Sequence, residues 1–268
     1  MHDVARLQDH LRQLGRVLLG YSGGVDSALL AVVGARTLGP DGFLAVIGTS
    51  ASYPDAQYRA ALEVAERFAI PVRELATHEL DDPRYLANPV NRCYFCKTEL
   101  WSSLTALAVS EGFDAIIDGT NADDRGEHRP GLAAGAEWRV RSPLAELGFG
   151  KSVIRDLSRE LGIPGWDAPA APCLSSRIRY GLAVTTERLR QVESGEALLR
   201  RLGLTGDLRV RHLGDRARIE ALPDQFARLE ECWNEVVYGF ARLGFTSVER
   251  DPRGYRRGSL LVLEPAVT

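Results

Sequence analysis

The segment Ser22-Gly-Gly-Val-Asp-Ser27 constrains the fold of this chain more than any other part of the sequence. It follows a short apolar run at 17–21 that is typical of a buried strand, and it leads into residues 26–37, whose Ala, Leu and Val pattern predicts a helix. A turn between a strand and a helix leaves backbone N–H groups unpaired and directs them, with the positive end of the helix dipole, toward an anion. The segment therefore predicts a phosphate-binding loop in an α/β protein.

The residue types in this loop suit that chemistry. Gly23 and Gly24 allow a positive φ and close approach of the backbone, and the hydroxyls of Ser22 and Ser27 can donate to phosphate oxygens. The carboxylate of Asp26 would repel a phosphate unless a divalent cation lay between them, so Asp26 is a candidate Mg²⁺ ligand. The alternative is a simple glycine turn in which Ser or Asp caps the helix. The six residues resemble the PP-loop of ATP pyrophosphatases, which implies ATP cleavage between the α- and β-phosphates and transfer of AMP to an acceptor.

Strand and helix patterns alternate through the first part of the chain. The expected strands are 17–21, 43–49, 72–75 and 115–118, and the expected helices are 3–15, 26–37, 54–68 and 91–111. Such alternation indicates a parallel sheet covered on both faces. We expect an α/β fold whose Rossmann-like PP-loop domain covers residues 1–165.

The rest of the chain has a different organisation. Residues 166–181 are rich in Pro, Ala and Gly, which predicts a linker, and this linker carries Cys173. A smaller α+β domain that binds substrate is expected over 182–268. Its expected elements are helices at 186–202 and 223–243 and strands at 207–212, 216–221, 246–250 and 259–263.

Composition excludes several classes of protein. The formal net charge is −3 and the isoelectric point about 6.0, so no global positive field recruits nucleic acid or an anionic membrane. No apolar run approaches the roughly 20 residues of a membrane span, and the charged amphipathic N-terminus is unlike a signal peptide. Four cysteines in 268 residues are too few for a disulfide framework, so we expect a reducing compartment, the cytoplasm.

Two further segments bear on nucleotide binding. Asp118-Gly-Thr-Asn-Ala-Asp-Asp124 follows a predicted strand, which puts Gly119, Thr120, Asn121 and Asp124 at the carboxyl edge of the sheet, where open α/β folds bind ligands. An Asx turn is the alternative, and a similar segment lies at the nucleotide in PP-loop enzymes. Residues 145–152 fit a relaxed Walker A pattern, but neither a leading strand nor the first glycine is present. We expect Lys151 instead in the first turn of a helix near the active site.

The cysteines indicate sulfur or metal chemistry. Cys93 and Cys96 form a C-x-x-C pair at the start of a predicted helix, and Cys173 lies far away in the sequence. Together they could bind three irons of a [4Fe–4S] cluster, or zinc with a fourth ligand, and a chance pair of buried cysteines is the alternative. Cys173 could also act as a thiolate nucleophile or sulfur donor if Lys97, Arg177 and Arg179 lowered its pKa. Cys232, within an apolar helical pattern, is expected to be a packing residue.

Several motifs together resemble the LarE family of ATP-dependent sulfur transferases, which build the nickel-pincer nucleotide cofactor. The resemblance covers nearly the whole chain, and Pro172-Cys-Leu-Ser-Ser-Arg177 separates this family from other PP-loop enzymes. The matching segments are 22–27, 91–97, 118–124, 129–131, 166–169, 172–177, 209–211 and 254–259.

The resemblance implies a substrate and a set of roles. The substrate is pyridinium-3,5-dicarboxylic acid mononucleotide, whose carboxylates are adenylated with ATP and Mg²⁺ and then converted to thiocarboxylates. Arg209 and Arg211 bind its phosphate, and Lys97 and Arg177 are further substrate-binding residues. Sulfur comes either from Cys173 itself, which becomes dehydroalanine, or from a [4Fe–4S] cluster held by the three cysteines, the version that the C-x-x-C pair favours. The implied partners are copies of the chain in a homo-oligomer, for example a hexamer, and other enzymes of the nickel-pincer pathway.

Three other functions remain open at this point. A tRNA thiolase shares the PP-loop and often has paired cysteines, but the acidic charge and the lack of a recognisable RNA-binding domain count against it. An amidating ligase resembling NAD or GMP synthetase would use ammonia, and its cysteines would be incidental. A non-catalytic nucleotide sensor could have the same fold.

Overall fold

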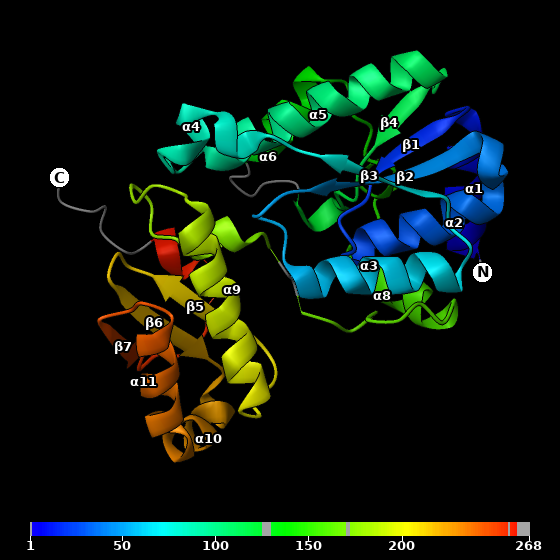
Figure 1. Ribbon diagram of the computed structural model, residues 1–268. Coiled ribbons are helices and arrows are strands. Elements are labelled where there is room, and N and C mark those ends of the chain that lie inside the picture. Colours follow the sequence, from blue (N-terminus) through cyan, green and yellow to red (C-terminus); the bar gives the residue numbers. More distant parts are fainter. Residues whose placement is uncertain (1, 125–129, 170–171, 257, 262–268) are drawn as a thin grey trace. The chain divides into compact units, whose positions relative to one another are not determined.

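The computed structural model describes residues 2–124, 130–169, 172–256 and 258–261 and divides the chain into two compact units (Figure 1). Unit 1 comprises Met1–Glu79 and Asn91–Ala171, and unit 2 comprises Leu80–Val90 and Pro172–Thr268. Unit 1 thus continues beyond residue 165, the limit expected from the sequence. The segment Leu80–Val90, expected in the first domain, packs with unit 2 instead.

The core of unit 1 is a sheet of four parallel strands in the order β3-β2-β1-β4. Val17 lies opposite both Phe43 and Ala115, so neighbouring strands start in register and end at the same carboxyl edge. This sheet confirms the predicted α/β fold class. The strands are β1 Val17–Gly20, β2 Phe43–Thr49, β3 Val72–Ala76 and β4 Ala115–Ile117.

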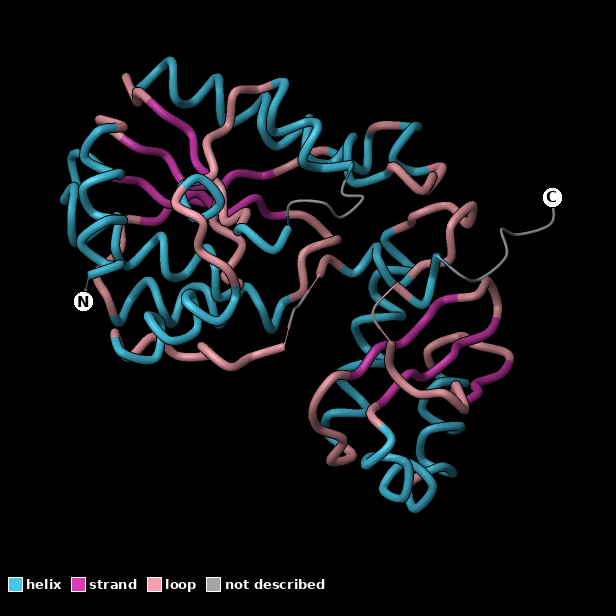
Figure 2. The backbone as a smooth tube through the Cα atoms, turned by 180° about the vertical axis from the view of Figure 1, so that it is seen from behind, coloured by secondary structure: helices cyan, strands magenta, loops and turns pink. Residues whose placement is uncertain are grey.

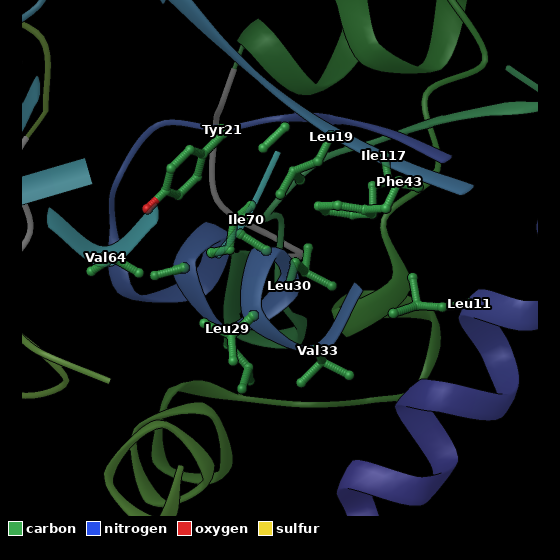
Figure 3. Close-up of a cluster of buried hydrophobic side chains, with 14 of the residues drawn as sticks. Leu11, Leu19, Tyr21, Leu29, Leu30, Val33, Phe43, Val64, Ile70 and Ile117 are labelled. Atoms are coloured by element: carbon green, nitrogen blue, oxygen red, sulfur yellow. The ribbon is translucent and has the colours of Figure 1, made fainter. Parts of the chain in front are cut away.

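Helices cover both faces of this sheet (Figures 1 and 2). On one face, Leu29 and Leu30 of the second helix pack with Phe43 and Ile117 in a large apolar cluster (Figure 3). On the other face, the fully buried ring of Trp101 centres a second cluster. The first face carries α1 His2–Gln13, α2 Val25–Gly42, α3 Asp55–Arg67 and α8 Lys151–Glu160, and the second carries α5 Arg92–Glu111 and α6 Pro130–Glu137.

Unit 2 has a three-stranded sheet in the order β5-β6-β7, with β5 and β6 antiparallel and β6 and β7 parallel. Cys232 is buried in its apolar core, where it packs as predicted. The side chain of Thr185 caps α9 by accepting a hydrogen bond from the backbone N–H of Arg188. The elements are α4 Pro83–Leu86, α9 Thr186–Arg201, β5 Leu208–His212, β6 Arg216–Ala221, α10 Phe226–Glu231, α11 Trp233–Arg242 and β7 Ser247–Arg250.

Two predictions for unit 2 are wrong. The helix expected over 223–243 is divided into a 3₁₀ turn, α10 and α11, with a break at Cys232. The strand expected over 259–263 is not formed, because Ser259–Leu261 is a 3₁₀ helix; residues 262–263 lie outside the described residues. Gly254 and Gly258 have positive φ values of 69° and 76°, which turn the chain away from an extended path. Within the described ranges, no helix is both long and apolar enough to cross a membrane.

Candidate active site

The glycine loop 22–24 connects β1 to α2 at the carboxyl edge of the sheet. Gly24 is the N-cap of α2 and provides no side-chain cap. The first backbone bond of the helix runs from the N–H of Ala28 to the carbonyl of Gly24, at 2.9 Å. Helix geometry leaves the N–H groups of Val25, Asp26 and Ser27 without intrahelical partners, so they are available to an anion together with the positive end of the dipole.

Gly23 fits its position because of both conformation and space. Its φ is +69°, and an added Cβ would lie 2.7 Å from the Cβ of Ala61 on α3. A side chain at this position would therefore be strained and would collide with α3. The hydroxyls of Ser22 and Ser27 lie 3.2 Å apart, so the two predicted phosphate donors are neighbours.

Asp26 is a half-buried carboxylate in the first turn of α2. Its Oδ2 pairs with the ammonium group of Lys151 and accepts from the amide of Asn121 at 3.4 Å. Its Oδ1 is buried and has no hydrogen-bond partner among the described residues. Burial raises the pKa of Asp26, while Lys151 opposes that rise. An unpaired buried carboxylate oxygen fits a Mg²⁺ ligand, because a divalent cation would satisfy the oxygen that the protein leaves unpaired.

The segment 118–124 follows β4 and packs directly against the start of α2. A Cβ on Gly119 would lie 3.0 Å from the backbone nitrogen of Ser27, so a side chain at this position would push the backbone at the start of α2 away. Asn121 is fully buried, and its backbone N–H donates to Asp124 at 3.1 Å. The hydroxyl of Thr120 donates to Asp118 at 2.8 Å. The structure thus brings Gly119 and Asn121 to Asp26 and uses Thr120 within the turn itself.

Lys151 completes this group of residues. It is the first residue of α8, and its backbone N–H donates to Asp123 at 2.7 Å while its ammonium group pairs with Asp26. The preceding element is the short helix α7, Pro143–Glu146, so the Walker-like pattern lacks its leading strand. The sequence predicted the place of Lys151 in a first helical turn, but only the structure shows that its partner is Asp26.

Cys93 and Cys96 lie in the first turns of α5, which begins at Arg92. The Cys93 side chain is exposed and that of Cys96 is half-buried. The Arg92 guanidinium lies 4.0 Å from the sulfur of Cys93, and the Lys97 ammonium lies 4.8 Å from the centre of the Trp101 ring. The predicted C-x-x-C pair therefore lies at the positive end of a helix, and the Arg92 guanidinium lies beside Cys93.

Cys173 belongs to unit 2 and is the N-cap residue of the 3₁₀ turn Leu174–Arg177. Its carbonyl accepts from the hydroxyl of Ser176 at 2.7 Å and from the guanidinium of Arg177 at 3.0 Å. Glu196 of α9 holds that guanidinium with contacts of 3.0 and 3.3 Å. The backbone at Cys173 is therefore held by the buried Arg177 guanidinium, which pairs with the half-buried Glu196.

Arg209 and Arg211 alternate along β5 and are both buried. Arg211 pairs with Glu220 at 2.7 Å and donates to Ser259 at 2.9 Å. Arg209 lies over the Tyr255 ring at 5.0 Å, and burial, followed by the charge of Arg177, lowers its pKa. Buried arginines close to one another favour binding of an anion such as a phosphate.

The predicted site residues fall into groups that follow the two units. Unit 1 holds the glycine loop, the segment 118–124, Cys93, Cys96 and Lys97, whereas unit 2 holds Cys173 and the three arginines 177, 209 and 211. The described parts of the chain contain no group of three or more His, Cys, Asp or Glu side chains in an arrangement that could hold a metal. Sequence reasoning missed Glu196 and Glu220, because a glutamate on a helix or strand carries no signal until its partner is known.

Comparisons with known proteins agree with these features. A model of the NAD synthase family matches residues 4–83. "Uncharacterized protein slr1717" of Synechocystis sp. is 42% identical over 96% of this chain and 96% of its own length. Pyridinium-3,5-bisthiocarboxylic acid mononucleotide synthase of Lactiplantibacillus plantarum is 35% identical over 96% of this chain and 92% of its own length. Cytoplasmic tRNA 2-thiolation protein 1 of Malassezia globosa is 34% identical, but over only 43% of this chain and 34% of its own length.

Proposed function

This chain belongs to the LarE family of ATP-using PP-loop sulfur transferases, and on that premise we propose that its substrate is pyridinium-3,5-dicarboxylic acid mononucleotide. The proposed reaction adenylates the carboxylates of this mononucleotide and converts them to thiocarboxylates during synthesis of the nickel-pincer nucleotide cofactor. The relative from L. plantarum, similar over almost its whole length, is named for the corresponding bisthiocarboxylic product.

One observation of this chain carries the proposal. Arg177 fixes the backbone of Cys173 and also belongs, with Arg209 and Arg211, to a set of buried guanidinium groups in the same unit. A thiol with a fixed backbone beside an anion site suits a sulfur donor for a phosphorylated substrate. Under the proposal, the arginines of unit 2 bind the phosphate of the mononucleotide. Lys97 is proposed as a further substrate-binding residue.

The first proposed step is adenylation. The N–H groups at the start of α2 and the hydroxyls of Ser22 and Ser27 bind the phosphates of ATP; Asp26 would hold Mg²⁺, which would offset phosphate charge. A carboxylate oxygen of the substrate attacks the α-phosphorus of ATP, the bond from that phosphorus to the oxygen bridging the α- and β-phosphates breaks, and pyrophosphate leaves. The negative charge that develops on the phosphates is stabilised by the loop and by Lys151. The product is an acyl adenylate, from which AMP is a good leaving group.

The second proposed step replaces AMP by sulfur at the carboxyl carbon. Under the proposal, Cys93 and Cys96, one helical turn apart on α5, and Cys173 would be the ligands of three irons of a [4Fe–4S] cluster. Bound there, such a cluster would supply a coordinated sulfide to the acyl adenylate. In the alternative, Cys173 attacks the carboxyl carbon with its own sulfur and AMP leaves. A base then removes the Cα proton of residue 173, the Cα=Cβ bond of dehydroalanine forms, and the Cβ–S bond breaks to release the thiocarboxylate.

Two measurements on the full chain test the proposal. The first is iron and sulfide analysis after anaerobic purification. The second is reaction of the purified protein with ATP, Mg²⁺ and the dicarboxylic mononucleotide. We expect release of AMP and pyrophosphate that depends on substrate, and a product in which sulfur replaces oxygen. Mass spectrometry of the protein then separates the two donors, because loss of sulfur at Cys173 rejects the cluster route and repeated turnover by intact protein rejects the sacrificial route. Amide formation with ammonia by Cys173→Ala, or thiolation of tRNA instead of the mononucleotide, would refute the proposal.

The proposed partners are tested on the same preparation. We propose that the chain forms a homo-oligomer and supplies its product to the other enzymes of the nickel-pincer pathway. Light scattering during size-exclusion chromatography measures the mass of the assembly, and a mass equal to one chain would exclude the oligomer.

A further inference from the structure

The carbonyl oxygen of Ser22 accepts two hydrogen bonds from the segment that follows β2. The hydroxyl of Tyr53 donates to it at 3.1 Å, and the side-chain amide of Gln57, in the first turn of α3, also donates to it. Two side chains from one neighbouring segment therefore determine the direction in which this carbonyl points.

The direction of that carbonyl also sets the direction of an N–H group. The structure contains no cis peptide bond among its described residues, so the peptide between Ser22 and Gly23 is trans. In a trans peptide the C=O and the N–H point in opposite directions. When Tyr53 and Gln57 hold the carbonyl on the α3 side, the N–H of Gly23 faces away from α3. That N–H precedes those of α2 in the glycine loop, where successive N–H groups can surround an anion.

A buried carboxylate holds the segment that carries these donors. Glu79 is 1% exposed, and its Oε1 accepts from the hydroxyls of Ser50 at 2.5 Å and Ser52 at 2.7 Å. Both serines lie in the turn between β2 and α3, immediately before Tyr53. The same carboxylate thus ties the turn at two points. Burial raises the pKa of Tyr53, which keeps its phenol protonated and able to donate.

We propose that Tyr53 and Gln57 are positioning residues that aim the Gly23 N–H at the phosphates of ATP, and that Glu79 holds their segment through Ser50 and Ser52. Tyr53, Gln57 and Glu79 all lie outside the motif at 22–27 that contains the glycine loop. The proposal rests on ATP use by this chain and adds a requirement to it: the loop needs a second segment to become a phosphate site.

Matched tyrosine variants test the positioning role. Tyr53→Phe removes one donor to the Ser22 carbonyl, and Gln57→Met removes the other with little change in volume. Loss of one hydrogen bond of this kind predicts an increase of about three- to tenfold in the Kd for Mg²⁺·ATP and for Mg²⁺·pyrophosphate. Tyr58→Phe is the control, because Tyr58 lies on α3 beside Gln57 but its hydroxyl donates to Glu74 of β3 and not to the loop. Its Kd values should equal those of the wild type.

Rescue by a conservative change tests the role of Glu79. Glu79→Gln keeps a carbonyl oxygen for the two serines, whereas Glu79→Leu removes the acceptor that both hydroxyls share and leaves them only their contact with each other at 2.9 Å. We expect Glu79→Gln to bind Mg²⁺·ATP within about twofold of the wild type and Glu79→Leu to lose about tenfold or more. If Glu79→Leu does not fold, Ser52→Ala serves in its place, with an expected loss of about three- to tenfold by the same reasoning.

Isothermal titration calorimetry on the full chain, with thermal unfolding measured on the same samples, decides between positioning and simple packing. Lower thermal stability of Tyr53→Phe and Gln57→Met with unchanged Kd for ATP and pyrophosphate would overturn the proposal. Failure of the proposed function is a separate result. If the wild type binds ATP but transfers no sulfur, the Kd values of the variants and the wild type can still be compared.

Discussion

Replacing Asp26 by Asn should stabilise the folded chain while destroying the candidate ATP site. The wild-type carboxylate is buried, its Oδ1 has no partner among the described residues, and its Oδ2 pairs with Lys151, whose side chain is 42% exposed. Asparagine keeps the shape and removes the charge. The variant therefore separates the energy of the buried charge from that of packing.

The magnitude follows from two opposing terms. A buried acceptor without a partner destabilises the native state by about 1–3 kcal/mol, and by more when the acceptor is charged, so Asp26→Asn removes the part of this cost that is due to the charge. The ion pair with a side chain as exposed as Lys151 stabilises it by only about 0–1 kcal/mol, because solvent screens the attraction. We expect Asp26→Asn to raise the free energy of unfolding by about 1 kcal/mol at pH 7, which corresponds to an increase in Tm of about 2–4 °C for a chain of this size.

The pH dependence gives an independent measurement of the same effect. The pKa of Asp26 is raised in the folded state above its ordinary value of 3.8, so in this window the native chain binds more protons than the unfolded chain. Stability of the wild type therefore falls as pH rises from 3.8 through the raised pKa. Asp26→Asn lacks this titration, so its advantage should be small near pH 4 and reach its full size above the raised pKa.

Urea unfolding at several pH values measures both quantities, and calorimetric titration with Mg²⁺·ATP measures the lost site. Asp156→Asn is the control, because this residue forms an exposed pair with Arg159 on α8, at 2.8 Å. Its effect should stay within about 0.5 kcal/mol. An Asp26→Asn variant that is less stable than the control at pH 7, or whose advantage shrinks as pH rises, would show that the charge of Asp26 is compensated in the native state.

Three further predictions concern unit 2. Glu196→Gln weakens the ion pair that holds Arg177, so the rate of sulfur transfer should fall by more than about tenfold while the Kd for ATP is unchanged. Equal losses in the product assay and in the ATP titration would contradict this role. Burial lowers the pKa of His212 to about 4. The free energy of unfolding of the wild type should therefore fall by about 2–3 kcal/mol as pH falls from 6.5 to 4. Urea unfolding of His212→Gln should show a weaker dependence of stability on pH. The side-chain amide of Asn88 donates to three backbone carbonyls at 2.8–3.3 Å. Asn88→Ala removes these hydrogen bonds and should lower the free energy of unfolding, measured by chemical denaturation, by about 2–4 kcal/mol. A decrease below about 1 kcal/mol would show that these hydrogen bonds do not stabilise the fold.

Much of the architecture followed from local patterns. The strand at 43–49 and the strand at 216–221 have the limits that the apolar pattern predicted, and the strand, loop and helix around the glycine segment lie where the sequence placed them. These elements are predictable because the apolar pattern that indicates each one lies entirely within that element. The pattern at 259–263 failed for a related reason, since a short apolar run carries no information about the glycine turns and the buried Ser259 contacts that direct the chain there.

The chemistry of the glycine loop was determined by the sequence itself, because unpaired N–H groups, glycine freedom and the helix dipole all arise within a few consecutive residues. Only the tertiary structure decided the partners of the buried charges, such as Lys151 for Asp26, Glu196 for Arg177 and Glu220 for Arg211. Burial makes each of these pairings necessary, and the folded backbone selects which of many possible residues meets the need. The sequence therefore names the reactive groups, whereas the packing of distant segments determines their charge state and orientation.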